Sequence, residues 1–113
     1  MSVNLLQSAY KTSLSKEEKA KNAEKMAEVL HSKATKEKFK LLDILEKIGE
    51  YKRYIEEAES EEEKKADMKK LKELQASYAP QLKKYQSARK SYGQVVSRHN
   101  LHYDESLEDF RDV

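Results

Sequence analysis

The stretch Glu59-Ser-Glu-Glu-Glu-Lys-Lys-Ala66 decides how this chain folds, because it separates two apolar heptad patterns that are out of phase. Seven of its eight residues are polar, so the stretch cannot continue either apolar stripe. Within it, Ser60 and Glu63 have the spacing of a capping box, which marks the start of a helix. The stretch therefore predicts a turn at about 59–62 and a second helix that begins near residue 61.

The segment before this turn carries an apolar residue at every seventh position over 20–55, with a second apolar row three positions later. This is the a/d pattern of a coiled coil, and its one charged interruption is Glu37. Ser15 and Glu18 form another capping box. The pattern therefore predicts a first helix over about 15–58.

The segment after the turn has its own stripe, in which Leu71 is followed at seven-residue intervals by three tyrosines. Continuing the first register would place Lys69 rather than Leu71 on the stripe, so the phase slips by two residues. An antiparallel hairpin with a second helix over about 61–99 accounts for this slip. One continuous helix with a stutter, as in a long parallel dimer, is the alternative.

Side-chain size favours the hairpin over the parallel dimer. With a turn near 59–60, the numbers of facing residues sum to about 119, so Ala34 faces Tyr85. By the same rule, Ala27 faces Tyr92. Small side chains thus meet large ones, and the helices can approach closely. We therefore expect an all-α, coiled-coil-like antiparallel helical hairpin.

We expect one hairpin domain over 1–103, followed by a flexible acidic tail over 104–113. Pro80 removes a backbone hydrogen bond, so it is expected to kink the second helix or to break it in two. The first ten residues can add a short helix through their apolar side chains, namely Val3, Leu5, Leu6, Ala9 and Tyr10.

The composition excludes several classes of protein. The chain has 113 residues, of which 39% are charged, with 2 Gly, 1 Pro and no Cys. So few turn formers exclude β-sandwiches, β-barrels and Gly-rich phosphate-binding folds, and the lack of Cys excludes disulfides, thiolate catalysis and zinc ribbons. No apolar run approaches the length of a membrane span, and no signal sequence is recognisable, so we expect a cytoplasmic location.

No constellation of residues indicates catalysis, a metal site or a cofactor. The histidines are His31, His99 and His102, and no third ligand accompanies the last two. The chain also lacks the Gly-rich phosphate-binding and nucleophile-elbow motifs. We therefore expect no enzymatic activity, no cofactor, no metal and no small-molecule substrate.

Apolar residues outside the heptad rows predict an interface. The first helix is apolar on more than one stripe around 39–55, which two helices alone cannot cover. A dimer that forms a four-helix bundle would cover it. The expected interface comprises four residues of this helix and two anchors in the acidic tail, namely Phe39, Leu42, Leu45, Tyr54, Leu107 and Phe110.

Charge alternates along the chain, although the net charge is only +2. The net charge is +4 over 11–40, −5 over 41–67, +7 over 68–103 and −4 over 104–113. A hairpin would collect the basic blocks at its open end, where the second helix contributes Lys83, Lys84, Arg89, Lys90 and Arg98. Such an end can bind phosphate backbones, dock on an acidic protein, or receive the acidic tail of its own chain or a neighbour.

These features predict a non-enzymatic protein–protein interaction module, such as an adaptor, chaperone or regulator, with a protein partner and self-association. The alternative is a small nucleic-acid-binding or nucleoprotein-inhibiting protein that uses the basic open end. Salt distinguishes the two, because phosphate contacts weaken steeply as salt rises. A membrane-surface helix over 3–14 is disfavoured, because that segment is short and its only basic residue is Lys11.

Overall fold

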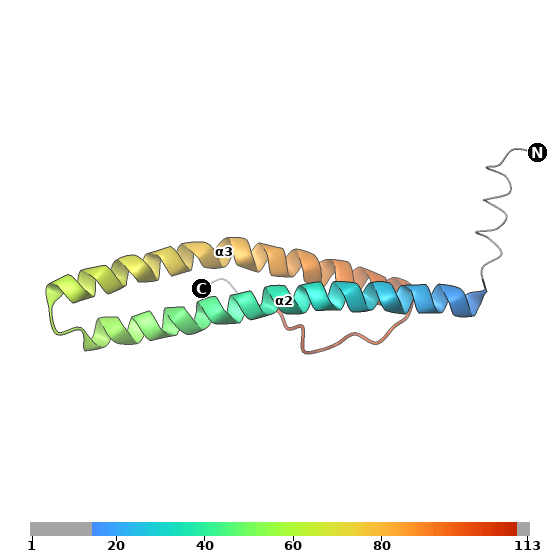
Figure 1. The fold of residues 1–113 in the computed structure, drawn as a ribbon, viewed down its shortest axis with the longest axis horizontal. Coiled ribbons are helices and arrows are strands. Elements are labelled where there is room, and N and C mark those ends of the chain that lie inside the picture. Colours follow the sequence, from blue (N-terminus) through green and yellow to red (C-terminus); the bar gives the residue numbers. More distant parts are fainter. Residues whose placement is uncertain (1–14, 111–113) are drawn as a thin grey trace, which may run out of the picture.

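The computed structural model describes residues 15–110, which form two long antiparallel helices followed by a returning segment (Figure 1). Helix α2 spans Lys16–Glu57 and helix α3 spans Glu61–Arg98. The predicted all-α hairpin is confirmed, and one continuous helix is wrong, because the chain reverses direction between α2 and α3. At about 1.5 Å per residue, each helix is about 60 Å long.

Serine caps begin both helices. The Ser15 hydroxyl accepts a hydrogen bond from the Glu18 backbone N–H at 3.1 Å, and the Ser60 hydroxyl accepts one from Glu63 at the same distance. The Glu63 carboxylate also accepts from the Glu59 backbone N–H at 3.3 Å. Acidic side chains in the first turn of each helix interact favourably with the positive end of the helix dipole and so stabilise the helix.

The core lies in the seam between the helices and pairs small residues with large ones. Ala34 of α2 and Tyr85 of α3 are both 0% exposed. Ala27, Leu41, Tyr78 and further apolar residues belong to the same buried cluster. Burial of tyrosine rings against alanines lets the two helices lie close together along the basic half of the hairpin.

The charged residue in the seam, Glu37, has a polar partner on the facing helix. The Gln81 amide donates to the Glu37 backbone carbonyl at 3.1 Å and also to the Glu37 carboxylate. Their residue numbers sum to 118, which is one less than the value of about 119 expected for facing residues. If the register shifted so that Glu37 or Gln81 faced an apolar residue, its polar group would lie in the seam without a partner. This pair therefore favours the observed register.

Helix α3 continues through Pro80, so a break of the second helix at this residue is wrong. Tyr78 and Leu82 lie on either side of the proline and are both buried, so α3 is held in the core both before and after Pro80. A kink at Pro80 stays a prediction. The expected N-terminal helix lies outside the described residues.

The chain turns back at the end of α3. Asn100 adopts a positive φ of 52°, and the Leu101 backbone N–H donates to the Val96 carbonyl at 2.9 Å. This is the geometry of a Schellman C-cap, in which Asn is one of the few residues that tolerate the left-handed conformation. Residues 101–110, hereafter the tail segment, then run back along the hairpin (Figure 1).

Candidate functional site

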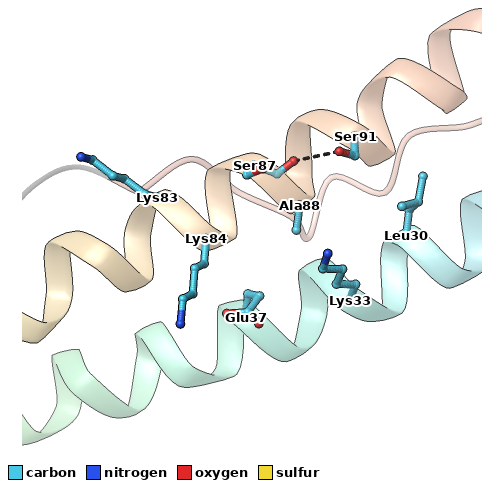
Figure 2. Close-up of a pocket in the computed structure, with 8 residues that line it drawn as sticks. All are labelled: Leu30, Lys33, Glu37, Lys83, Lys84, Ser87, Ala88 and Ser91. Atoms are coloured by element: carbon cyan, nitrogen blue, oxygen red, sulfur yellow. Dashed lines mark hydrogen bonds between the residues drawn. The ribbon is translucent and has the colours of Figure 1, made fainter.

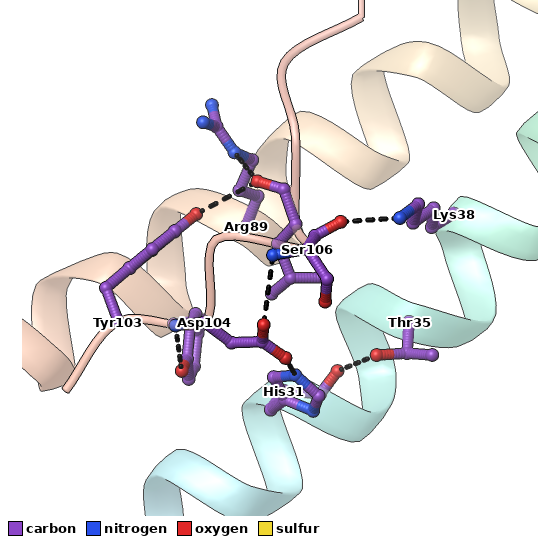
Figure 3. Close-up of polar contacts among 9 residues, drawn as sticks. His31, Thr35, Lys38, Arg89, Tyr103, Asp104 and Ser106 are labelled. Carbon is purple, nitrogen blue, oxygen red and sulfur yellow. Dashed lines mark hydrogen bonds and ion pairs between the residues drawn. The ribbon is translucent and has the colours of Figure 1, made fainter.

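The open end of the hairpin has two different faces. One face, hereafter the uncovered face, is left open by residues 15–110 and holds a pocket of about 510 Å³ between α2 and α3 (Figure 2). The other face carries the tail segment, which contacts side chains of both helices (Figure 3). The helix residues that hold the tail form the tail-binding face, which comprises His31, Lys38, Tyr85, Arg89 and Tyr92.

Three successive tail carbonyls, those of residues 106–108, accept hydrogen bonds from the tail-binding face. The Lys38 ammonium group binds the first, Arg89 Nε binds the second at 2.8 Å, and the Tyr85 hydroxyl binds the third at 2.6 Å. The Tyr85 hydroxyl is protonated at neutral pH, and burial raises its pKa further, to about 12. All three acceptors are main-chain atoms, so these hydrogen bonds do not themselves select particular side chains of the tail.

Asp104 anchors the start of the bound tail. Its carboxylate lies 2.6 Å from His31 Nε2 and accepts a hydrogen bond from the Ser106 backbone N–H at 2.9 Å. Its own backbone N–H donates to the Tyr92 hydroxyl at 3.1 Å. The pKa of Asp104 is lowered to about 2, mainly by the hydrogen bond from the Ser106 N–H and to a smaller extent by the contact with His31.

Two apolar side chains of the tail pack against the helices. Leu107 is only 1% exposed and belongs to the hydrophobic core. The Phe110 ring meets the Tyr85 ring edge-on, with centroids 5.4 Å apart, and the Tyr103 ring lies 5.1 Å from that of Tyr92. The tail segment is therefore part of the packed structure, although the sequence predicted a flexible tail.

Ion pairs add to these contacts but are mostly exposed. Lys38 lies 3.6 Å from the Glu108 carboxylate, and Arg89 lies 3.8 Å from that of Asp109. Because both carboxylates are largely in solvent, each pair contributes about 0–1 kcal/mol and is screened by salt. The buried Leu107 and the main-chain hydrogen bonds therefore contribute most of the binding.

The structure does not bring the five basic residues predicted at the open end together on one face. Arg89 belongs to the tail-binding face, whereas Lys83 and Lys84 border the pocket on the uncovered face. Lys90 and Arg98 are exposed on α3. The sequence predicts only Arg89 among the five residues of the tail-binding face. The opposite charges of the tail and the open end do indicate that the tail and the open end are in contact.

Three of the four α2 residues of the predicted apolar patch lie on one flank of the helix, and Tyr54 lies on the other. Leu42 directly follows a core position of α2, whereas Tyr54 directly precedes one, so at about 100° per residue they lie on opposite flanks. Phe39 is 64% exposed and lies three residues before Leu42, about 60° from it around the helix, so it is on the same flank. Leu45 is half-buried and packs against the core.

Within residues 15–110, no group of three or more His, Cys, Asp or Glu side chains is placed to hold a metal ion. His99 and His102 are exposed beyond the end of α3. Neither described helix has an apolar stretch that could cross a membrane, and the expected cytoplasmic location stays a prediction.

The low pKa of Asp104 predicts that acid weakens tail binding. The carboxylate stabilises the bound tail above its ordinary pKa of 3.8, and this contribution is lost as the pH falls toward the bound value of about 2. We expect the Leu107 amide resonance, followed by NMR, to move toward its unbound position as the pH falls from about 4 to about 2. Asp104→Asn should remove this part of the transition, and an unchanged acid profile in that variant would contradict the assignment.

No protein-family model, curated protein or solved structure matches this chain.

Proposed function

We propose that this chain is a non-enzymatic protein-interaction module whose tail-binding face receives an acidic segment of a partner protein. The observation that carries the proposal is the chain's own tail, which is held on this face by side chains of both helices. The bound tail thus serves as a template for the kind of segment the face accepts.

The contacts of the tail define the chemistry of the partner segment. A carboxylate at the position of Asp104 meets His31, and an aliphatic side chain three residues later fills the buried site of Leu107. An aromatic ring another three residues later packs on Tyr85, as Phe110 does. The partner is therefore a segment with an acidic, an aliphatic and an aromatic residue at three-residue intervals.

The tail of the same chain competes with any such partner. A covalently attached segment acts at an effective concentration of about 1 mM, so a free segment must bind tightly or meet a chain whose tail has left. In this proposal the tail limits binding to partners that fit the face better than the tail itself does.

The test measures binding of a labelled peptide with the sequence of residues 101–113. Its binding is followed by fluorescence anisotropy with the full-length chain and with the full-length Leu107→Asp variant, in which the attached tail is weakened. We expect the variant to bind the peptide at least about ten-fold more tightly, because its face is vacated. A peptide that carries aspartate in place of its leucine is the matched control. Equal binding of both peptides, or binding of the peptide by neither chain, would contradict the proposal.

We also propose self-association through the flank of α2 that carries Leu42 and Leu45. Leu42 is 39% exposed, and Leu45, three residues later on the same flank, is half-buried. Sedimentation at micromolar concentration should show a dimer that Leu42→Glu disrupts. The exposed Ser32 provides a control, because Ser32→Glu adds the same charge on α2 away from this flank. A monomeric native chain would contradict self-association.

A further inference from the structure

The uncovered face of the open end gathers basic side chains from both helices. Lys33 of α2 and Lys84 of α3 border the 510 Å³ pocket, with Leu30 and Ala88 among its apolar lining. Figure 2 shows that Lys33 and Lys84 extend from opposite helices toward the space between them, whereas Lys83 points away. Ammonium groups from two helices thus frame one concave surface.

The basic side chains continue along this face beyond the pocket. On α2, Lys19, Lys33 and Lys40 each directly precede a position of the heptad row that faces α3. On α3, Lys84 and Arg98 do the same. In an antiparallel helix pair, positions that precede the core row lie on one common face. The basic stripe from Lys19 to Lys40 is therefore about 30 Å long.

Little negative charge opposes this stripe. None of the three lysines that line the pocket forms an ion pair with another residue of 15–110. Glu37, the acidic residue of the pocket lining, lies 3.6 Å from Lys40 and is held by the Gln81 amide. The chain has no acidic residue from 74 to 103, and none of the helix side chains that hold the tail segment lines the pocket.

We propose that this uncovered face is a second binding site, which takes the phosphate backbone of a nucleic acid. A line of ammonium groups matches a strand whose charges repeat evenly, because duplex DNA carries one charge per about 1.7 Å of its axis. Lysine binds phosphate as a point charge without reading base sequence. The site is independent of the tail-binding face and does not depend on the function proposed for it.

The chemistry of the two faces distinguishes a nucleic acid from an acidic peptide on this site. The tail-binding face places Arg89 Nε and the Tyr85 hydroxyl on peptide carbonyls and buries the Leu107 side chain. The uncovered face instead offers ammonium groups spread over about 30 Å beside a shallow apolar floor. Basic groups spread over this length can contact a long, uniformly charged strand along its course, whereas a short peptide with apolar anchors would contact only a few of them.

The test uses the full-length chain and a fluorescein-labelled DNA duplex of about 24 base pairs, followed by anisotropy from about 20 to 200 mM NaCl. We expect binding at low salt that weakens steeply as salt rises. Lys33→Gln combined with Lys84→Gln should weaken binding at least about ten-fold at low salt and should reduce the slope of log K against log salt by about 2. Replacing both lysines with arginine should retain binding.

Lysines at the closed tip provide the matched control. Lys64→Gln combined with Lys65→Gln changes the net charge equally, at two exposed residues far from the pocket, and should leave DNA binding unchanged. Absence of DNA binding at about 20 mM salt, or an equal loss in both double variants, would overturn the proposal. Labelled polyglutamate is the second probe. If it binds as tightly as DNA and loses affinity equally in the Lys33/Lys84 variant, the site is for acidic proteins and the nucleic-acid proposal is wrong.

Discussion

Replacing Tyr85 with alanine is expected to lower the free energy of unfolding by about 3–5 kcal/mol, the largest effect we expect of a single core substitution. Tyr85 has no exposed surface and belongs to the same buried cluster as Ala34 of α2, which is too small to fill the space that the ring would leave. The substitution also removes the support of the Phe110 ring. Because domains of this size are stable by about 5–15 kcal/mol, a large part of the total would be lost.

Urea denaturation followed by far-ultraviolet circular dichroism measures this loss, and Tyr85→Phe separates its causes. Phenylalanine keeps the ring and removes only the hydroxyl bond to the Glu108 carbonyl, so it should cost about 0.5–1.5 kcal/mol. Equal losses for the two substitutions would mean that the hydroxyl, and not the ring, carries the stability. A loss below about 1 kcal/mol for alanine would contradict the assignment of Tyr85 to the core.

The hairpin was predictable because its signals are local and repeat many times. Each heptad row shows which side of a helix is apolar. Because the phase slips after Glu59, the apolar stripe of the first segment does not continue into the second, so the two segments cannot form one helix with a single apolar side. The capping boxes at Ser15 and Ser60 then define both helix starts, and the structure places both caps as expected. Agreement between periodicity, capping and side-chain size leaves little freedom in the fold.

Local rules were less reliable where packing competes with them. Pro80 is expected to kink α3 or to break it; the break does not occur, and the residues two positions to either side of the proline are buried, whereas the kink stays a prediction. The prediction of an apolar patch on α2 rests on apolar content alone. Counting positions from the core row would have shown from the sequence that Leu42 and Tyr54 lie on opposite flanks. The arrangement of the patch residues is therefore predictable from a helical projection of the sequence. The continuity of α3 through Pro80 is not, because it depends on tertiary contacts.

The tail-binding face was the least predictable part. Its five side chains come from two helices and converge only after the hairpin has formed, and each also fits an ordinary solvent-facing or core position. The one local signal is Asn100, because Asn just after a helix favours the left-handed C-cap that turns the chain back. Charge alternation showed that the tail and the open end attract, but it does not show which residues meet.

Leu107→Asp is expected to release the tail segment while the hairpin stays folded. Leu107 is the only buried residue of 101–110, and an aspartate there would place an unpaired charge in an apolar site, at a cost of several kcal/mol. The exposed ion pairs of the tail cannot offset that cost, since each contributes about 0–1 kcal/mol. The α2–α3 seam toward the closed tip does not involve the tail, so the helix content over 16–98 should remain.

A nitroxide on Glu105→Cys reports this release, because the native chain has no cysteine and Glu105 is exposed. In the otherwise native chain, the label should broaden the amide resonances of α2 around His31, whose ring lies against the adjacent Asp104. Leu107→Asp should remove this broadening without changing the circular dichroism of the helices. His102→Asp adds an acidic residue at an exposed tail position and should preserve the broadening. Persistence of the broadening in Leu107→Asp would mean that the main-chain hydrogen bonds alone hold the tail, and the partner's aliphatic residue would then lose its role in recognition.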